Sequence, residues 1–122
     1  MTLTFPNGLV GFPQAQRFGL VAWGGDGSPF NLLECLDVEG LAFVVVPPEV
    51  FFADYEPELE IGEHDVVLVI VTVPDRVEDA TANLLGPLII DTTTGTGRQA
   101  VLAPEQWPSR RPLLTQRSTS AA

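Results

Sequence analysis

The stretch TANLLGPLIID, residues 81–91, is the part of the sequence that most directly indicates the fold. Its polar start leads into two leucines, Gly86-Pro87 interrupts the run, and three aliphatic residues follow. A Thr/Gly-rich turn, residues 92–97, separates it from a second short apolar run, residues 100–103. Two such runs around a turn predict a β-hairpin. Pro87 has no amide hydrogen to donate, so we expect an irregularity or a strand start there.

Short apolar segments separated by turn residues continue on the N-terminal side of this hairpin. They predict strands at residues 3–5, 18–23, 41–46 and 66–73, a strand or short helix at 30–36, one or two helical turns at 49–55 and a loop at 56–65. About seven short strands without βαβ alternation indicate one mainly antiparallel all-β domain, either a sandwich or a small barrel. We place this domain at residues 1–112 and expect a disordered tail at 113–122.

The composition fits a globular protein of 122 residues with 45% hydrophobic residues. A single cysteine, Cys35, excludes an internal disulfide framework and is typical of a reducing compartment. The N-terminus has neither the basic nor the apolar region of a signal peptide, and the apolar runs are much shorter than the ~20 residues that span a bilayer. These features predict a cytoplasmic protein.

The charge is strongly negative and uneven. The net charge is −10, there is no lysine, and residues 49–65 contain seven acidic residues and no basic one. Such a field repels nucleic acid and attracts basic partners over a range of ~8–10 Å at ordinary salt. Direct binding of DNA or RNA is therefore disfavoured.

Residues suited to catalysis or metal binding are scarce. His64 is the only histidine, and no Gly-x-Ser-x-Gly motif accompanies it. One cysteine and one histidine do not make a closed zinc site, and the Asp-x-Asp-x-Asp-Gly spacing of a calcium loop is absent. Cys35 lies in an apolar run, as small core residues do. The sequence predicts no enzyme, no catalytic residue, no cofactor and no metal.

A binding surface is the positive signal that remains. Phe51, Phe52 and Tyr55 lie beside the acidic segment, and aromatic anchors rimmed by charge are typical of binding patches. Phe51 and Phe52 cannot both face the core from one short helical segment, so we expect one to be exposed. A merely solvated acidic face is the simpler interpretation of the same segment.

Six segments resemble the FliW family of flagellar assembly factors in order and spacing. They are FPNGLVGF (5–12), PFNLLEC (29–35), FVVVPP (43–48), DY (54–55), TANLLGPLII (81–90) and GRQAVL (97–102). The resemblance spans about residues 3–110. The sequence departs from the family pattern at turns and strand ends: Glu34-Cys35 replaces Gln-Ser, Pro47 replaces Asp, Gly86 replaces Ala and Asp91 replaces Asn.

The resemblance implies a small antiparallel β-barrel-like domain without catalysis, and two protein partners. These are flagellin and CsrA, the RNA-binding repressor of flagellin translation, which FliW-like proteins hold off the flagellin messenger RNA. We expect Asp54, Tyr55, Glu56 and Glu58 to contribute to a surface for a basic partner. Asn83 is a second candidate, either as a partner contact or as a turn cap. We expect a monomer.

Two alternatives from other functional classes remain open. One is a β-rich module that binds a small ligand or carbohydrate, with Trp23 and Trp107 as stacking platforms. The other is a hydrolase that uses a carboxylate pair including Glu58.

Overall fold

A computed structural model describes residues 1–114 of the chain. Its elements in chain order are β1 (Thr2–Thr4), β2 (Arg17–Ala22), β3 (Asn31–Cys35), β4 (Ala42–Val46), the 3₁₀ turn η1 (Pro48–Val50), β5 (Asp65–Thr72), the 3₁₀ turn η2 (Val77–Asp79), β6 (Thr81–Ala82), β7 (Leu88–Asp91), β8 (Thr96–Gln99) and β9 (Arg111–Pro112). No helix within residues 1–114 has the length and apolar character needed to cross a membrane.

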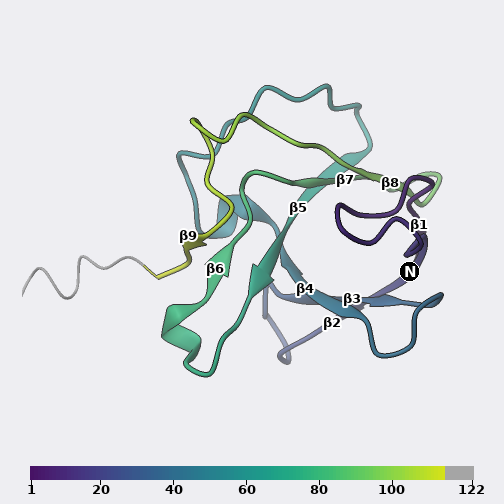
Figure 1. Cartoon of the computed structure of the whole chain (residues 1–122), viewed down its shortest axis with the longest axis horizontal. Helices are drawn as coiled ribbons and strands as arrows, with labels where there is room; N and C mark the ends of the chain where they lie inside the picture. Colours follow the sequence, from purple (N-terminus) through teal and green to yellow (C-terminus); the bar gives the residue numbers. More distant parts are fainter. Residues whose placement is uncertain (115–122) are drawn as a thin grey trace, which may run out of the picture.

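Seven of the strands close into a barrel. The order β4-β3-β2-β1-β8-β7-β5 returns to its start because β5 also pairs with β4 (Figure 1). Every pairing is antiparallel except the single parallel contact of β1 with β8. β6 and β9 extend the sheet beyond β5. The structure thus confirms the all-β, barrel-like, mainly antiparallel prediction.

The predicted β-hairpin is present, but its second strand lies earlier in the sequence than the apolar run 100–103, where we expected it. β7 pairs with β8, residues 96–99, from Leu88↔Gln99 to Asp91↔Thr96, and the apolar run 100–103 lies beyond the strand. The turn closes early because the Asp91 carboxylate accepts hydrogen bonds from Thr93. β8 needs no large apolar residue inside, because the ring of Phe5 covers it: a Cβ at Gly97 would lie 2.5 Å from Phe5 Cζ.

The shorter elements refine the predictions further. Of residues 30–36, for which a strand or a short helix was expected, Asn31–Cys35 form the strand β3. The helical segment expected at 49–55 is only the single 3₁₀ turn η1, and Pro48 occupies its first position, where the missing amide hydrogen of a proline removes no helical bond. The connection between β5 and the hairpin contains η2 and β6.

The inner core fills the barrel. Alternate residues of each strand point inward, since side chains in a strand have a period of two. Phe18, Leu33, Val45, Leu68 and Leu88 meet there. The N-terminal loop supplies further buried side chains, among them Leu9 and Ala15, so this loop closes one barrel opening, as the purple trace in Figure 1 shows.

A second core lies on the outer face of β4, β5 and β6. Val46, Val69 and Val71 point outward from these strands and are buried against Phe52 and the C-terminal segment. This layer explains why residues 43–46 and 68–71 are apolar without alternation: both faces of these strand segments are covered, which in an antiparallel sheet is otherwise the exception.

The irregularity expected from Pro87 is a long bulge in the chain between β6 and β7. Both of these strands pair with β5. Between the last β6 pair and the first β7 pair, β5 contributes two residues (69–70) and the returning chain contributes five (83–87). Pro87 is fully buried inside this bulge, where its missing amide hydrogen removes no ladder bond.

The C-terminal segment belongs to the domain as far as Leu113. The backbone amide of Leu113 donates to the carbonyl of Ala80, and its side chain is buried in the second core. Of the tail expected at 113–122, Leu113 therefore packs against the domain and Leu114 is exposed, while residues 115–122 lie outside the described residues.

Candidate protein-interaction surface

The segment of residues 56–61, which we call the acidic strap, follows the turn after η1 and has no helix or strand of its own. Its side chains alternate: those of Glu56, Glu58 and Glu60 are exposed, and those of Pro57 and Leu59 are half-buried. Alternation of this kind marks an extended chain, in which every second residue points the same way and recurs about 6.5 Å further on. The strap therefore displays a row of three carboxylates on one side.

The inner side of the strap rests on the barrel. Leu59 and Ile61 face Val67 of β5 and Pro48 across a small hollow of about 260 Å³. Arg98 donates from Nη2 to the carbonyl oxygen of Glu60 at 2.7 Å. In Figure 1 this segment forms part of the teal loop that arches over the top of the molecule. The strap is thus fixed by side-chain packing and one arginine rather than by a β-ladder.

The carboxylates of the strap form no ion pair within residues 1–114. The guanidinium groups in ion pairs there bind other acids: Arg17 contacts Asp37, Arg76 contacts Glu78 and Arg111 contacts Asp54. Arg98 uses the backbone of Glu60, not its carboxylate. The row of charges therefore acts outward, toward solvent or a partner.

Asp54 forms an intramolecular contact instead of extending this row. Its Oδ1 lies 3.1 Å from Arg111 Nη2 in β9, and the same guanidinium lies over the ring of Phe52, 5.2 Å from its centroid. Asp54 thus joins the η1 turn to the C-terminal segment. Its negative charge is partly offset by Arg111.

Tyr55 points into the protein rather than toward solvent. Its hydroxyl donates to the carbonyl oxygen of Leu84 at 2.7 Å, and its ring meets Trp107 edge to face at 4.7 Å between centroids. Burial raises the pKa of Tyr55 above its ordinary value, so the phenol stays protonated and remains a donor. The residue anchors the start of the strap to the bulge.

Asn83 caps a turn. Its Oδ1 accepts hydrogen bonds from the backbone amides of Leu85 and Gly86, at 3.1 and 3.0 Å. The backbone amide of Asn83 donates to the carbonyl oxygen of Ile70. This is the turn-capping role of the two considered for it, because the side chain replaces the ladder bonds that the bulge interrupts. Of the five predicted site residues, Glu56 and Glu58 are exposed and form no ion pair within residues 1–114, whereas Asp54, Tyr55 and Asn83 are bonded within the fold.

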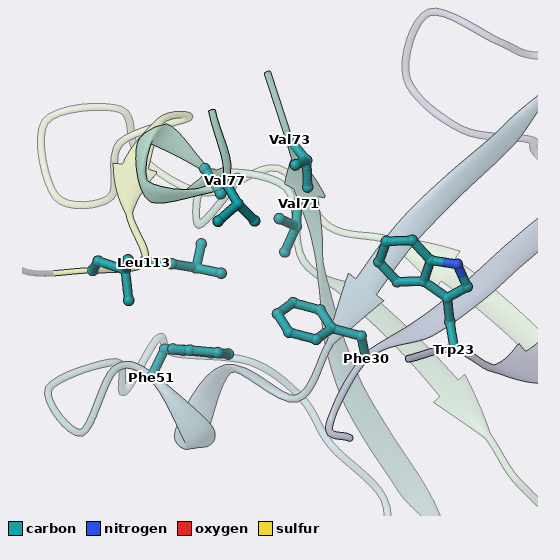
Figure 2. A pocket seen from close by; sticks show the side chains of 9 residues that line it. Trp23, Phe30, Phe51, Val71, Val73, Val77 and Leu113 are labelled. Carbon is teal, nitrogen blue, oxygen red and sulfur yellow. The ribbon is translucent and has the colours of Figure 1, made fainter. Parts of the chain in front are cut away.

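A second surface feature, which we call the apolar hollow, was not anticipated from the sequence. It has a volume of about 250 Å³ and only apolar lining residues. Figure 2 shows side chains from four separate segments converging on it, including Phe30, Phe51, Val77 and Leu113, with Trp23 at its edge. Of the two adjacent phenylalanines, Phe52 is buried and Phe51 is half-exposed in this hollow.

The sequence held only a weak signal for the hollow. Trp23 and Val77 flank glycine- or acid-rich turns, where a large apolar side chain is unusual, and they are 45% and 67% exposed. Nothing in the sequence indicates that the loops after β2 and β5 meet η1 and the C-terminal segment. That meeting follows from barrel closure and from the second core.

The two tryptophans do not form a common stacking platform. Trp23 contacts Phe30 and lines the hollow, whereas Trp107 contacts Tyr55 and packs in the second core. The hollow also lacks the few polar groups by which ligand pockets orient a sugar. The arrangement gives no support to the carbohydrate alternative.

His64 and Cys35, the two side chains best suited to catalysis or metal binding, lie apart. His64 is exposed between acids, and Cys35 is half-buried against the inner core, where its sulfur accepts a hydrogen bond from the amide of Val38. Among the described residues, no three side chains of His, Cys, Asp or Glu form a group suited to holding a metal ion. The acidic strap and the apolar hollow therefore offer a partner charge and apolar contact.

Comparison with known proteins identifies the family. The family model described as "FliW protein" matches residues 1–113. Flagellar assembly factor FliW of Natranaerobius thermophilus is 38% identical, with 98% of this chain and 85% of the relative covered. That of Leptospira biflexa is 34% identical, with 92% and 80% covered.

A solved structure gives the same result for the fold. The crystal structure of a flagellar assembly factor FliW superposes with a TM-score of 0.84 at 28% identity, covering 93% of this chain and 86% of that one. The residues matched by the family model, 1–113, include the strap, the bulge and β9. The chain therefore belongs to the FliW family of flagellar assembly factors.

Proposed function

We propose that this protein is a non-enzymatic regulator that binds flagellin and the translational repressor CsrA in the cytoplasm. By binding CsrA it relieves repression of flagellin messenger RNA. Newly made flagellin competes for the protein and so returns CsrA to its repressing role. The family supports a role in flagellar assembly, and the partners follow from the resemblance of the sequence motifs.

The observation that carries the proposal is the outward row of Glu56, Glu58 and Glu60. A protein that binds RNA neutralises phosphates and is therefore basic where it does so. A row of carboxylates that form no ion pair within residues 1–114 attracts such a surface, speeds the encounter and disfavours RNA binding by this protein itself. A neutralised acidic surface, like that at Asp54, would do this less well.

A switch of this kind depends on differences in affinity. Flagellin shifts CsrA toward its free form only to the extent that the two partners disfavour each other on this protein. The coupling is reciprocal, so CsrA must weaken flagellin binding by the same factor. Both directions can be measured by titration.

The first test is to reverse the strap charges. We expect Glu56→Lys combined with Glu58→Lys to weaken CsrA binding by about tenfold or more at low salt, with little change in melting temperature, because both side chains are exposed. Isothermal titration calorimetry at two salt concentrations measures the affinity. The difference between the variant and the unmodified protein should shrink at high salt.

The matched control is Glu39→Lys combined with Glu105→Lys. These acids are also exposed, lie outside the strap, and give the same change in net charge. Equal weakening by both pairs would mean that only total charge matters. Unchanged affinity of the strap variant at low salt would remove the strap from the CsrA surface.

The second arm of the test adds flagellin. The titration with CsrA is repeated with flagellin already bound, and then in the opposite order. Loss of CsrA binding supports the switch, whereas unaffected binding would contradict competition between the partners. A protein that binds neither would exclude the proposed function.

A further inference from the structure

We propose that the apolar hollow is a docking site for the apolar side chains of an amphipathic segment of a protein partner, one that carries lysine or arginine beside its apolar face. The inference rests on the proposed function only in taking the occupant to be a protein. It assigns a second contact surface, separate from the acidic strap.

The lining of the hollow favours apolar side chains as occupants. Its walls are two aromatic rings, Phe30 and Phe51, with aliphatic side chains from β5, from the η2 loop and from the C-terminal segment (Figure 2). Exposed apolar residues that gather around a depression, rather than lying singly, mark a binding surface. Desolvated pockets lined by aromatic residues are where interface anchors insert.

The hollow is too small to enclose a whole small-molecule ligand of the usual size. The volume of about 250 Å³ is below the roughly 300–1,000 Å³ of pockets that enclose whole small molecules. The hollow offers no polar group to orient such a ligand. It has room for one or two large side chains, which is what a helix or strand laid across the surface would insert.

The charges around the hollow indicate which sign of charge the partner segment carries beside its apolar face. Three acids and one arginine, Asp75, Glu78, Asp79 and Arg76, lie in the segment that connects the lining residues Val73, Val77 and Ala80. The guanidinium of Arg76 contacts both Glu78 and Asp79, at 2.9 and 3.9 Å, and the nearby Arg111 is paired with Asp54. The net field at the rim is therefore negative, and a basic flank complements it.

Residues 115–122 are unsuited to filling the hollow. The eight residues after Leu114 include no apolar side chain larger than alanine. A segment without a large apolar side chain cannot fill a hollow of this kind, so residues 115–122 are not its occupant.

The test uses a designed helical peptide with leucine at positions i, i+3, i+4 and i+7 and lysine elsewhere, and a second peptide with glutamate in place of lysine. Calorimetry measures the dissociation constant of each for the full chain and for two variants. Val77→Asp introduces a charge at the hollow, and Val101→Asp is the matched control, because the two valines are 67% and 68% exposed. Leu114→Asp serves as a second hollow variant.

We expect Val77→Asp and Leu114→Asp to weaken binding of the Leu/Lys peptide at least about tenfold, Val101→Asp to leave it unchanged, and the Leu/Glu peptide to bind more weakly throughout. Equal binding by all variants would overturn the proposal, because the peptide would then be held by charge alone. Self-association of the protein that Val77→Asp abolishes would also overturn it, by making a second copy the occupant.

The same variants separate this inference from the proposed function. If CsrA and flagellin both bind Val77→Asp as they bind the unmodified chain, the hollow is not part of either interface and the inference fails while the proposed function stands. If the unmodified chain binds neither protein, the proposed function fails and the peptide titration still decides the hollow.

Discussion

Tyr55 is the only tyrosine in the chain, so its ionisation can be followed directly. The phenol donates to Leu84 inside the fold, and burial disfavours the charged phenolate. The residue was expected at a partner surface on the grounds that aromatic rings beside charge are typical of interfaces. Sequence proximity to acids gave no information about which way the ring points.

The raised pKa of Tyr55 predicts a specific alkaline behaviour. The tyrosinate absorbance of the folded protein should stay low at pH 10, where an unperturbed tyrosine is half ionised. Because the folded pKa lies above the unfolded one, stability is unaffected below about pH 10 and falls as the pH rises beyond it.

Ultraviolet absorbance against pH measures this effect, and the same chain unfolded in urea is the internal control. The unfolded chain should titrate near pH 10. Half-ionisation of the folded protein at that same pH would show that Tyr55 is solvated and that its bond to Leu84 is not maintained.

The element scale concerns how neighbouring strands are joined. The turn between β3 and β4 carries Asp37, whose Oδ2 accepts from the amides of Arg17 and Gln16 at 2.7 and 3.0 Å, while its Oδ1 pairs with Arg17 Nε at 2.9 Å. These bonds, led by the Arg17 amide, lower the pKa of Asp37. One carboxylate thus joins the start of β2 to the turn that follows its partner strand.

Replacement of this carboxylate should give an acid-dependent loss of stability. We expect Asp37→Asn to lower the melting temperature at neutral pH, because the amide accepts these bonds more weakly than a carboxylate does. A depressed folded pKa contributes stability above the unfolded value of about 3.9, and the contribution is lost as pH falls through the folded value. The difference from the unmodified protein should therefore narrow below about pH 4.

Asp26→Asn is the comparison, since Asp26 is an exposed loop residue that makes none of these bonds. Thermal melts of the three proteins from pH 3 to 7 give the result. Equal melting temperatures for the two variants at pH 7 would contradict the role assigned to Asp37.

At the scale of the whole molecule, the fold depends on two cores rather than one. The barrel interior is closed by the N-terminal loop, and the outer face of β4 and β5 is closed by η1 and the C-terminal segment. Leu113 is the last buried residue of the outer layer. Its neighbour Leu114 is 48% exposed, so the pair offers a direct test of this layer.

We expect Leu113→Ala to lower the free energy of unfolding by about 2–5 kcal/mol, since it removes buried methyl groups and leaves a cavity. Leu114→Ala should stay within about 0.5 kcal/mol of the unmodified protein, as surface substitutions usually do. Urea unfolding at constant m value measures both. Similar midpoints for the two variants would show that the C-terminal segment is not part of the cooperative unit.

Local pattern was sufficient for much of the architecture. Valine-rich runs without a polar face predicted β4 and β5, and the turn residues predicted most of the breaks between strands. It failed for β8, whose residues are polar or small because Phe5, far away in sequence, supplies the apolar contact above Gly97. When another segment supplies the apolar side chain over a strand, the strand itself need not show the alternation of apolar and polar residues by which strands are predicted.

The sequence by itself determined a single all-β domain, its acidic character, the shortage of catalytic side chains and the resemblance to FliW, since composition and local pattern are properties of the chain alone. Only the tertiary structure decided which predicted site residues are free. Glu56 and Glu58 project outward, while Asp54, Tyr55 and Asn83 find partners 57, 29 and 2–3 positions away. The apolar hollow likewise exists only after barrel closure brings four distant segments together, because burial and exposure depend on contacts between residues far apart in sequence.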